Sequence, residues 1–241
     1  MQERYLGDIH DFYKFLFIKH LAINLKDEIG LNWFLVDPKS ISKSELKKND
    51  GEKRDYLNNP KVAKLDDKLS LELSNLIKKK NRNLKNFTSK THLRKFIKFY
   101  NEKIIKEERK LWFEKSINFF YKNKIIFLDP DNGVIKKPYG RNLQKYVLID
   151  ELRNYQSEEK IIIFTQFQSY NKNFSLYLSE LISFLKFKGL KIKYPVLRNR
   201  SSPNTFYITI GENQSIGIQR LANVYKSYEK KINGKVELIT I

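Results

Sequence analysis

The chain has 241 residues, of which 41% are hydrophobic, so it can bury a sizeable core and is not an intrinsically disordered protein. It carries 47 Lys and Arg residues against 27 Asp and Glu residues, for a formal net charge of +20, and its lack of cysteine excludes disulfides, thiolate zinc sites and cysteine nucleophiles. An excess of positive charge attracts polyanions, which favours nucleic acid, RNA or DNA, as the partner; a lysine-rich coding bias is the alternative explanation. No run of about eighteen apolar residues and no secretory signal are present, so we expect a cytoplasmic protein with no membrane segment.

The first predicted elements are a helix, a strand and a loop. Residues 10–26 place apolar side chains at helical spacing and predict a helix that Asp8 could cap. Residues 31–38, "LNWFLVDP", form an apolar run that stops at Pro38 and predict a buried strand. The polar stretch 39–60 contains the turn signal "NDG" and predicts a long loop.

Residues 61–123 predict a basic helical insertion, with helices near 61–80, 91–104 and 106–122. Aromatic side chains lie between the positive charges of residues 77–110, a pattern typical of a nucleic-acid surface, because bases stack on rings while Lys and Arg bind phosphates. A solvated helical face whose aromatic side chains pack inward is the alternative. We assign nucleic-acid contacts to six residues of this segment: Lys78, Lys79, Lys80, Arg82, Arg94 and Lys95.

The second half of the chain predicts further strands and helices. Residues 124–129, "KIIFLD", and 159–166, "EKIIIFTQ", each contain a continuous apolar run, and an amphipathic helix at 142–156 separates them. Such alternation is typical of a parallel sheet covered on both faces. After a helix at 173–187, strands follow in "LKIKYPVL", "NTFYITI" and "KVELITI", and these could run antiparallel. The predicted fold class is α/β: a Rossmann-like, doubly wound, mostly parallel sheet in a single domain, 1–241, with the helical insertion.

Polar side chains follow one of the central strands. The stretch "FLDPDNG", residues 127–133, ends an apolar run with two acids, an amide and a glycine. Ligands of open parallel sheets bind outside the carboxyl ends of the strands. We therefore expect Asp129, Asp131 and Asn132 to face a crevice near Asp37, with Asp131 as an exposed turn carboxylate. A turn whose polar side chains cap their own backbone is the alternative.

The segment "GDIHDFYK" adds Asp8, Asp11 and Lys14 at the start of the first helix. Right-handed crossovers would place the start of this helix and the end of the central strand on the same edge of the sheet. We therefore expect Asp129 and Asp131 to share one crevice with Asp8 or Asp11. The helix dipole also favours carboxylates at a helix N-terminus, so their position alone does not require a function.

Both segments carry a resemblance to a known family. The "GDxxDxxK" pattern that begins at Gly7 resembles the "GNxxDxxKH" opening of the large-subunit rRNA adenine-N6 methyltransferases, and "FLDPDNG" resembles their "IDPPY/F" motif. In that family a helical insertion interrupts a Rossmann-like sheet, and the insertion expected here lies in a comparable place. The "GDxxDxxK" and "LDPDNG" pair is also similar to that of uncharacterised bacterial α/β proteins, which suggests no activity.

The methyltransferase resemblance implies S-adenosylmethionine as the cofactor and the amino group of a base as the methyl acceptor. It implies that Asp129 orients the target amine, with Asp131 and Asn132 at the adjoining catalytic positions. It also implies a cofactor-binding set of Asp8, Asp11, Lys14 and Asp37. The chain departs from the family at three points: Phe15 replaces the motif's histidine, an acid and an amide replace the second proline and the base-stacking ring, and "NWFLVDPKS" lacks the glycine-rich loop that S-adenosylmethionine approaches.

Two other functions fit the same residues. In a magnesium-dependent nuclease, Asp129 and Asp131, joined by Asp8 and Asp11, would hold Mg²⁺ through carboxylate oxygens, and Lys14 would stabilise developing charge. A non-enzymatic nucleic-acid-binding protein on the same fold would use only the basic segment.

Overall fold

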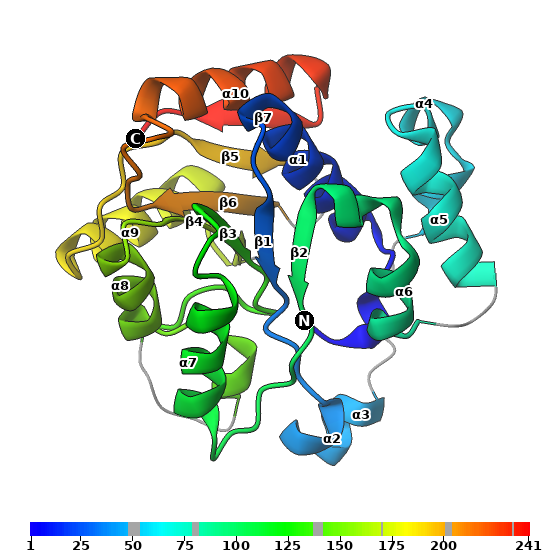
Figure 1. The fold of residues 1–241 in the computed structure, drawn as a ribbon, viewed down its shortest axis with the longest axis horizontal. Helices are drawn as coiled ribbons and strands as arrows, with labels where there is room; N and C mark the ends of the chain where they lie inside the picture. Colours follow the sequence, from blue (N-terminus) through cyan, green and yellow to red (C-terminus); the bar gives the residue numbers. More distant parts are fainter. Residues whose placement is uncertain (48–53, 79–81, 137–141, 170, 201–203, 233) are drawn as a thin grey trace.

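The computed structural model describes residues 1–47, 54–78, 82–136, 142–169, 171–200, 204–232 and 234–241 (Figure 1). Within these residues the strands form one seven-stranded sheet in the order β2-β1-β3-β4-β6-β5-β7. The strands are β1 (Ile29–Asn32), β2 (Ile97–Tyr100), β3 (Ile125–Leu128), β4 (Ile161–Phe167), β5 (Val196–Asn199), β6 (Thr205–Ile210) and β7 (Val236–Ile239). Strands β2, β1, β3 and β4 pair in parallel, and the remaining pairs are antiparallel. The predicted α/β class with a Rossmann-like sheet is confirmed.

Helices cover both faces of the sheet (Figure 1). One face packs against α1 (Ile9–Leu25), α5 (Asp67–Lys78), α6 (Leu84–Lys90) and α10 (Ile218–Lys231). The other packs against α7 (Arg109–Phe119), α8 (Ile149–Ser157) and α9 (Phe174–Phe187). In the described parts of the chain, no helix is both long and apolar enough to cross a membrane. The shorter helices are α2 (Pro38–Ile41), α3 (Lys43–Lys47), α4 (Pro60–Ala63) and the 3₁₀ turns Glu3–Tyr5, Asp55–Asn58, His92–Lys95 and Leu143–Lys145.

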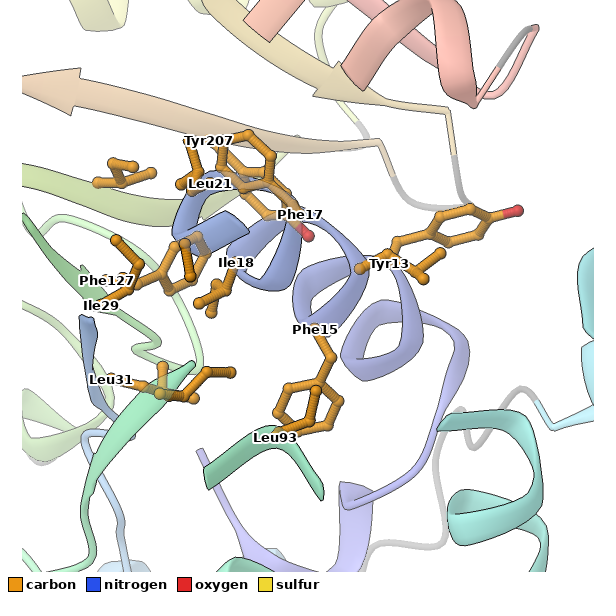
Figure 2. Packing of buried hydrophobic residues seen from close by; sticks show 14 of the residues in the cluster. Tyr13, Phe15, Phe17, Ile18, Leu21, Ile29, Leu31, Leu93, Phe127 and Tyr207 are labelled. Carbon is orange, nitrogen blue, oxygen red and sulfur yellow. The ribbon is translucent and has the colours of Figure 1, made fainter. Parts of the chain in front are cut away.

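The apolar strands owe their composition to these two layers. Successive side chains of a strand point to opposite faces, so a strand covered on both faces needs apolar residues throughout. In β3, Ile125 and Phe127 enter the core under α1, whereas Ile126 and Leu128 enter the core under α7 and α8. Figure 2 shows the first of these cores, where Phe17 of α1 stacks on Tyr207 of β6 with ring centroids 5.3 Å apart.

Several predicted elements are confirmed, and three predictions were wrong. The helices predicted at 10–26 and 173–187 are α1 and α9. The helix predicted at 91–104 is instead a 3₁₀ turn followed by β2, so a strand interrupts the predicted helical insertion 61–123. The loop predicted at 39–60 contains α3 and parts of other short helices, and the strand predicted at 31–38 begins at Ile29 and ends at Asn32. The charges of the 91–104 segment have helical spacing, but "IKFY" has the β-branched and aromatic residues of a strand.

Candidate functional site

Lys14 connects the start of α1 to the carboxyl end of β3. Its Nζ donates hydrogen bonds to Asp11 Oδ1 at 2.5 Å and to Asp129 Oδ2 at 2.6 Å, although Lys14 and Asp129 are 115 positions apart in sequence. The hydroxyl of Thr165 on β4 donates to Asp129 Oδ1 at 3.2 Å. Lys14 is only 3% exposed and Asp129 only 8%. We call Asp8, Asp11, Lys14, Asp129 and Thr165 the strand-end cluster.

Asp8 completes this cluster as the N-cap of α1, where its side chain accepts a hydrogen bond from the main-chain nitrogen of Asp11. Burial, together with the negative charge of Asp11, raises the pKa of Asp8 to about 8. Burial also raises the pKa of Asp11. Burial alone would lower the pKa of Lys14, but the carboxylates of Asp11 and Asp129 outweigh it and hold that pKa above its usual value. Asp8 is therefore mostly protonated at neutral pH, and Lys14 is charged.

The first residue of the chain lies beside the cluster. The ammonium group of Met1 donates to the main-chain oxygens of Trp33 at 3.1 Å, Phe34 at 2.7 Å and Asp129 at 3.3 Å. It also pairs with Asp131 Oδ1 at 3.1 Å. Met1, Trp33 and Phe34 are all at most 4% exposed. The space between the carboxyl ends of β1 and β3 is thus filled by the chain itself.

A second buried ionic group extends from Asp131. The amide of Gln2 donates to Asp131 Oδ2 and to Glu45 Oε1, each at 3.0 Å. Lys145 Nζ lies 2.9 Å from Glu45 Oε1 and 3.9 Å from Asp131 Oδ2, and Arg4 pairs with the same Glu45 oxygen at 3.2 Å. The side chain of Asp131 is only 9% exposed, so the expectation of an exposed turn carboxylate was wrong.

The structure therefore brings some of the predicted site residues together and not others. Asp8, Asp11, Lys14 and Asp129 share one cluster, with Asp131 joined to it through Met1. Asn132 donates its main-chain nitrogen to the carbonyl of Lys145 and accepts a bond from Gln166 on its own carbonyl. The side chain of Asp37 is instead 43% exposed. It caps α2 by accepting from the main-chain nitrogen of Lys39, and its Oδ2 lies 3.8 Å from Lys103 Nζ.

Neither implied cofactor fits these residues. Among the described residues, no three His, Asp or Glu side chains are grouped so that they could hold a metal ion. The carboxylates of Asp129 and Asp131 already face the cations of Lys14 and Met1, which would repel Mg²⁺. S-adenosylmethionine would have to approach the main chain after β1, where Trp33 and Phe34 are fully buried and their carbonyls accept from Met1.

A second candidate site lies at the free edge of β2. A groove of about 390 Å³ opens there, and its lining includes Glu28, Lys85, Arg94, Lys98, Phe99 and Phe119. We call these six residues the edge groove. Of the predicted nucleic-acid residues, Arg94 lines this groove. Lys95, the next residue in the sequence, is exposed. Arg82 donates to the carbonyl of Arg4, Lys78 ends α5, and Lys79 and Lys80 lie outside the described residues.

Sequence reasoning missed residues of both sites. Nothing in the sequence indicated that Thr165 belongs to a site, because a threonine within an apolar strand is usually a packing residue. Glu45 lay in a predicted loop and Lys145 in a predicted helix, and neither position marks a buried ion pair. The basic and aromatic composition of their segments could have indicated Lys98 and Phe119. The sequence predicted a helix at 91–104, however, so the strand β2 that carries Lys98 was not expected.

Comparison with known proteins adds no relative to these observations. A scan of protein families, a search of curated proteins and a search of solved structures found no match to this chain. The resemblance to the rRNA adenine-N6 methyltransferases therefore rests on the motifs at 7–14 and 127–133 alone.

Proposed function

We propose that this chain is a nucleic-acid-binding protein on a Rossmann-like fold, and that its strand-end cluster stabilises the fold instead of performing chemistry. The edge groove is the observation that carries the proposal, because it gathers Lys85, Arg94 and Lys98 with Phe99 and Phe119 around one surface opening. Positive side chains bind phosphates and aromatic rings stack on bases. The formal charge of +20 supplies the long-range attraction that such a surface needs.

The contacts within the strand-end cluster support a structural role for that cluster. A catalytic Asp129 would have to accept a hydrogen bond from a substrate amine, but its two oxygens already accept from Lys14 and Thr165. A perturbed pKa such as that of Asp8 is found in catalytic sites and also in structural ion-pair networks. The burial of every charged member of this cluster favours the structural role.

Fluorescence anisotropy with labelled RNA and DNA tests the proposal. We expect binding that weakens as salt rises from about 50 to 200 mM, because each phosphate contact releases counterions. Thr165→Val removes a hydroxyl of the strand-end cluster at nearly constant volume, and we expect it to leave the affinity unchanged. Failure to bind any oligonucleotide at about 50 mM salt would contradict the proposal.

Thermal shift measurements test the enzymatic alternatives directly. A ligand present at a hundred times its dissociation constant stabilises the folded state by about 2.7 kcal/mol. We expect no such stabilisation from S-adenosylmethionine, which the methyltransferase function requires, or from Mg²⁺, which the nuclease requires. A saturable rise in the unfolding temperature with either ligand would favour the corresponding enzymatic function over the structural role of the strand-end cluster.

A further inference from the structure

We propose that the edge groove binds a single-stranded segment of nucleic acid, with its phosphates on Lys85, Arg94 and Lys98 and a base stacked on Phe99. This inference rests on the proposed function and names its substrate class. Three observations carry it: the place of the groove in the sheet, the fixed orientation of the Phe99 ring, and the balance of charge around the opening.

The groove lies on a strand edge that the rest of the described sheet does not cover. Among the described strands, β2 is at the end of the strand order and pairs only with β1. Helix α6 contributes Lys85 to one side of the groove, and Phe119 at the end of α7 contributes to the lining as well. The volume of about 390 Å³ falls in the range of small-ligand sites, about 300–1,000 Å³. The opening is therefore large enough to admit part of a nucleotide chain.

Phe99 is a preorganised stacking surface. Its ring lies parallel to that of the buried Trp33, with centroids 5.9 Å apart and planes 9° apart. The indole nitrogen of Trp33 donates to Asn101 at 3.2 Å, which holds the indole in place. Phe99 itself is partly exposed and lines the groove. A ring that is already ordered loses little conformational entropy when a base stacks on it.

Lys98 is also held in position before any ligand arrives. Its Nζ donates to the carbonyl of Phe119 at 2.7 Å and lies 4.4 Å from the centroid of the Phe119 ring. Lys85 and Arg94 are exposed at the opening, and one guanidinium nitrogen of Arg94 donates to the Ser89 carbonyl. Among the described residues, none of these three side chains forms an ion pair with a carboxylate. The anchored ammonium and the two exposed cations could contact successive phosphates.

The charge balance favours an anionic ligand. The groove has Glu28 as its acidic lining residue, and Oε2 of Glu28 accepts a hydrogen bond from Asn123 at 3.3 Å. The lining therefore contains three cationic side chains and one carboxylate, and that carboxylate already accepts a hydrogen bond from Asn123. An acidic peptide could also add to the free edge of β2, but it would have no base to stack on Phe99. A duplex keeps its bases stacked on one another, so the Phe99 ring can reach only unpaired bases.

Fluorescence anisotropy with a labelled oligonucleotide of about 12 nucleotides, single-stranded or annealed, tests the inference. We expect the single strand to bind more tightly than the duplex. The double variant Lys85→Glu, Arg94→Glu is expected to weaken binding at least about tenfold and to lower the slope of log affinity against log salt by about 1.4, at about 0.7 per lost phosphate contact. The matched control is Lys226→Glu, Lys230→Glu, which reverses two exposed charges on α10.

Phe99→Leu separates stacking from charge. We expect it to weaken single-strand binding roughly tenfold while leaving the salt slope unchanged, because stacking releases no counterions. Phe119→Leu repeats the test beside Lys98 if the first variant does not fold. Photocrosslinking of a thymine oligonucleotide is expected to label the peptide that contains Phe99.

The possible outcomes distinguish this inference from the proposed function. If both nucleic acids bind but the groove variants behave like the α10 control, the groove is not the site and the proposed function stands. If neither nucleic acid binds, the proposed function fails as well. Equal affinity for duplex and single strand, or full competition by poly-glutamate with no effect of Phe99→Leu, would overturn the assignment of a single strand.

Discussion

The strand-end cluster and the edge groove are both built from charged side chains, but their charges have different partners. Lys14 is 3% exposed and contacts two carboxylates of its own chain. Lys85 and Arg94 are exposed and surround an opening. A buried charge is tolerated only when the protein itself supplies the opposite charge, whereas an exposed cation is solvated by water and free to meet an external anion.

This difference shows why charge alone is a poor guide to a functional site. The acids at 129 and 131 attract attention in the sequence because they end a central strand. Their partners, Lys14 and Met1, are distant in sequence and turn them into internal ion pairs. The groove draws its cations from α6, a 3₁₀ turn and β2, and contains far less acid. We therefore expect substitutions in the cluster to change stability, and substitutions in the groove to change binding.

The largest expected effect is that of Lys14→Met. This variant leaves Asp11 and Asp129 buried without their cation, and breaking a buried ion pair in this way costs about 3–5 kcal/mol. Urea unfolding measures the loss as a lower midpoint. The matched control is Lys98→Met in the edge groove, where a partly exposed ammonium donates to one carbonyl and its removal costs about 1 kcal/mol. Equal losses for the two variants would remove the distinction between the regions.

Asp131→Asn comes next, with an expected loss of about 1–3 kcal/mol. The carboxylate accepts from the Met1 ammonium and from Gln2, so its neutralisation leaves a buried cation with a weaker partner. An exposed turn carboxylate, which the sequence led us to expect at this position, would change the stability by no more than about 1 kcal/mol. Asp37→Asn is the matched control: the Asp37 side chain is 43% exposed and asparagine caps a helix equally well, so we expect almost no change in stability. A loss in Asp131→Asn no larger than in this control would show that Asp131 does not contribute to the buried ionic group.

Asp8→Asn is expected to alter the pH dependence of stability. Asp8 keeps its proton up to about pH 8 in the folded chain, whereas an ordinary aspartate loses it near 3.8. The folded state therefore binds more protons between these values, and its stability falls as the pH rises, by up to about 1.4 kcal/mol per pH unit. Asp11, whose pKa burial also raises, acts in the same direction.

Asparagine at position 8 can still cap α1 but has no proton to lose. Unfolding measured from pH 4 to pH 8 is therefore expected to show a shallower decline in the variant than in the parent chain. Parallel pH profiles for the two proteins would contradict the buried position of the Asp8 carboxyl.

The sequence predicted the fold better than it predicted the site. The apolar runs within 124–129 and 159–166 are typical of strands with both faces covered, and together with the helical pattern between them they predicted the α/β class. The meeting of Asp11 with Asp129 followed from the handedness of the crossovers. The identity of the bonded groups did not follow, because Lys14, Thr165 and Met1 reach Asp129 through side-chain and main-chain geometry that has no local signature. Strand β2 was concealed in the same way, since its four residues lie within a charged segment with helical spacing.

The smallest expected effect on stability is that of the double variant Lys85→Glu, Arg94→Glu. Both side chains are exposed, and Arg94 contributes a single hydrogen bond to the Ser89 carbonyl, so the free energy of unfolding should stay within about 0.5 kcal/mol of the parent value. Urea unfolding under the conditions of the binding assay measures it. This result is needed for the binding experiment, because a loss of affinity in a fully folded variant must come from the groove. A loss of stability above about 1 kcal/mol would instead give these cations an intramolecular role, as Lys14 has, and the two regions would no longer differ in kind.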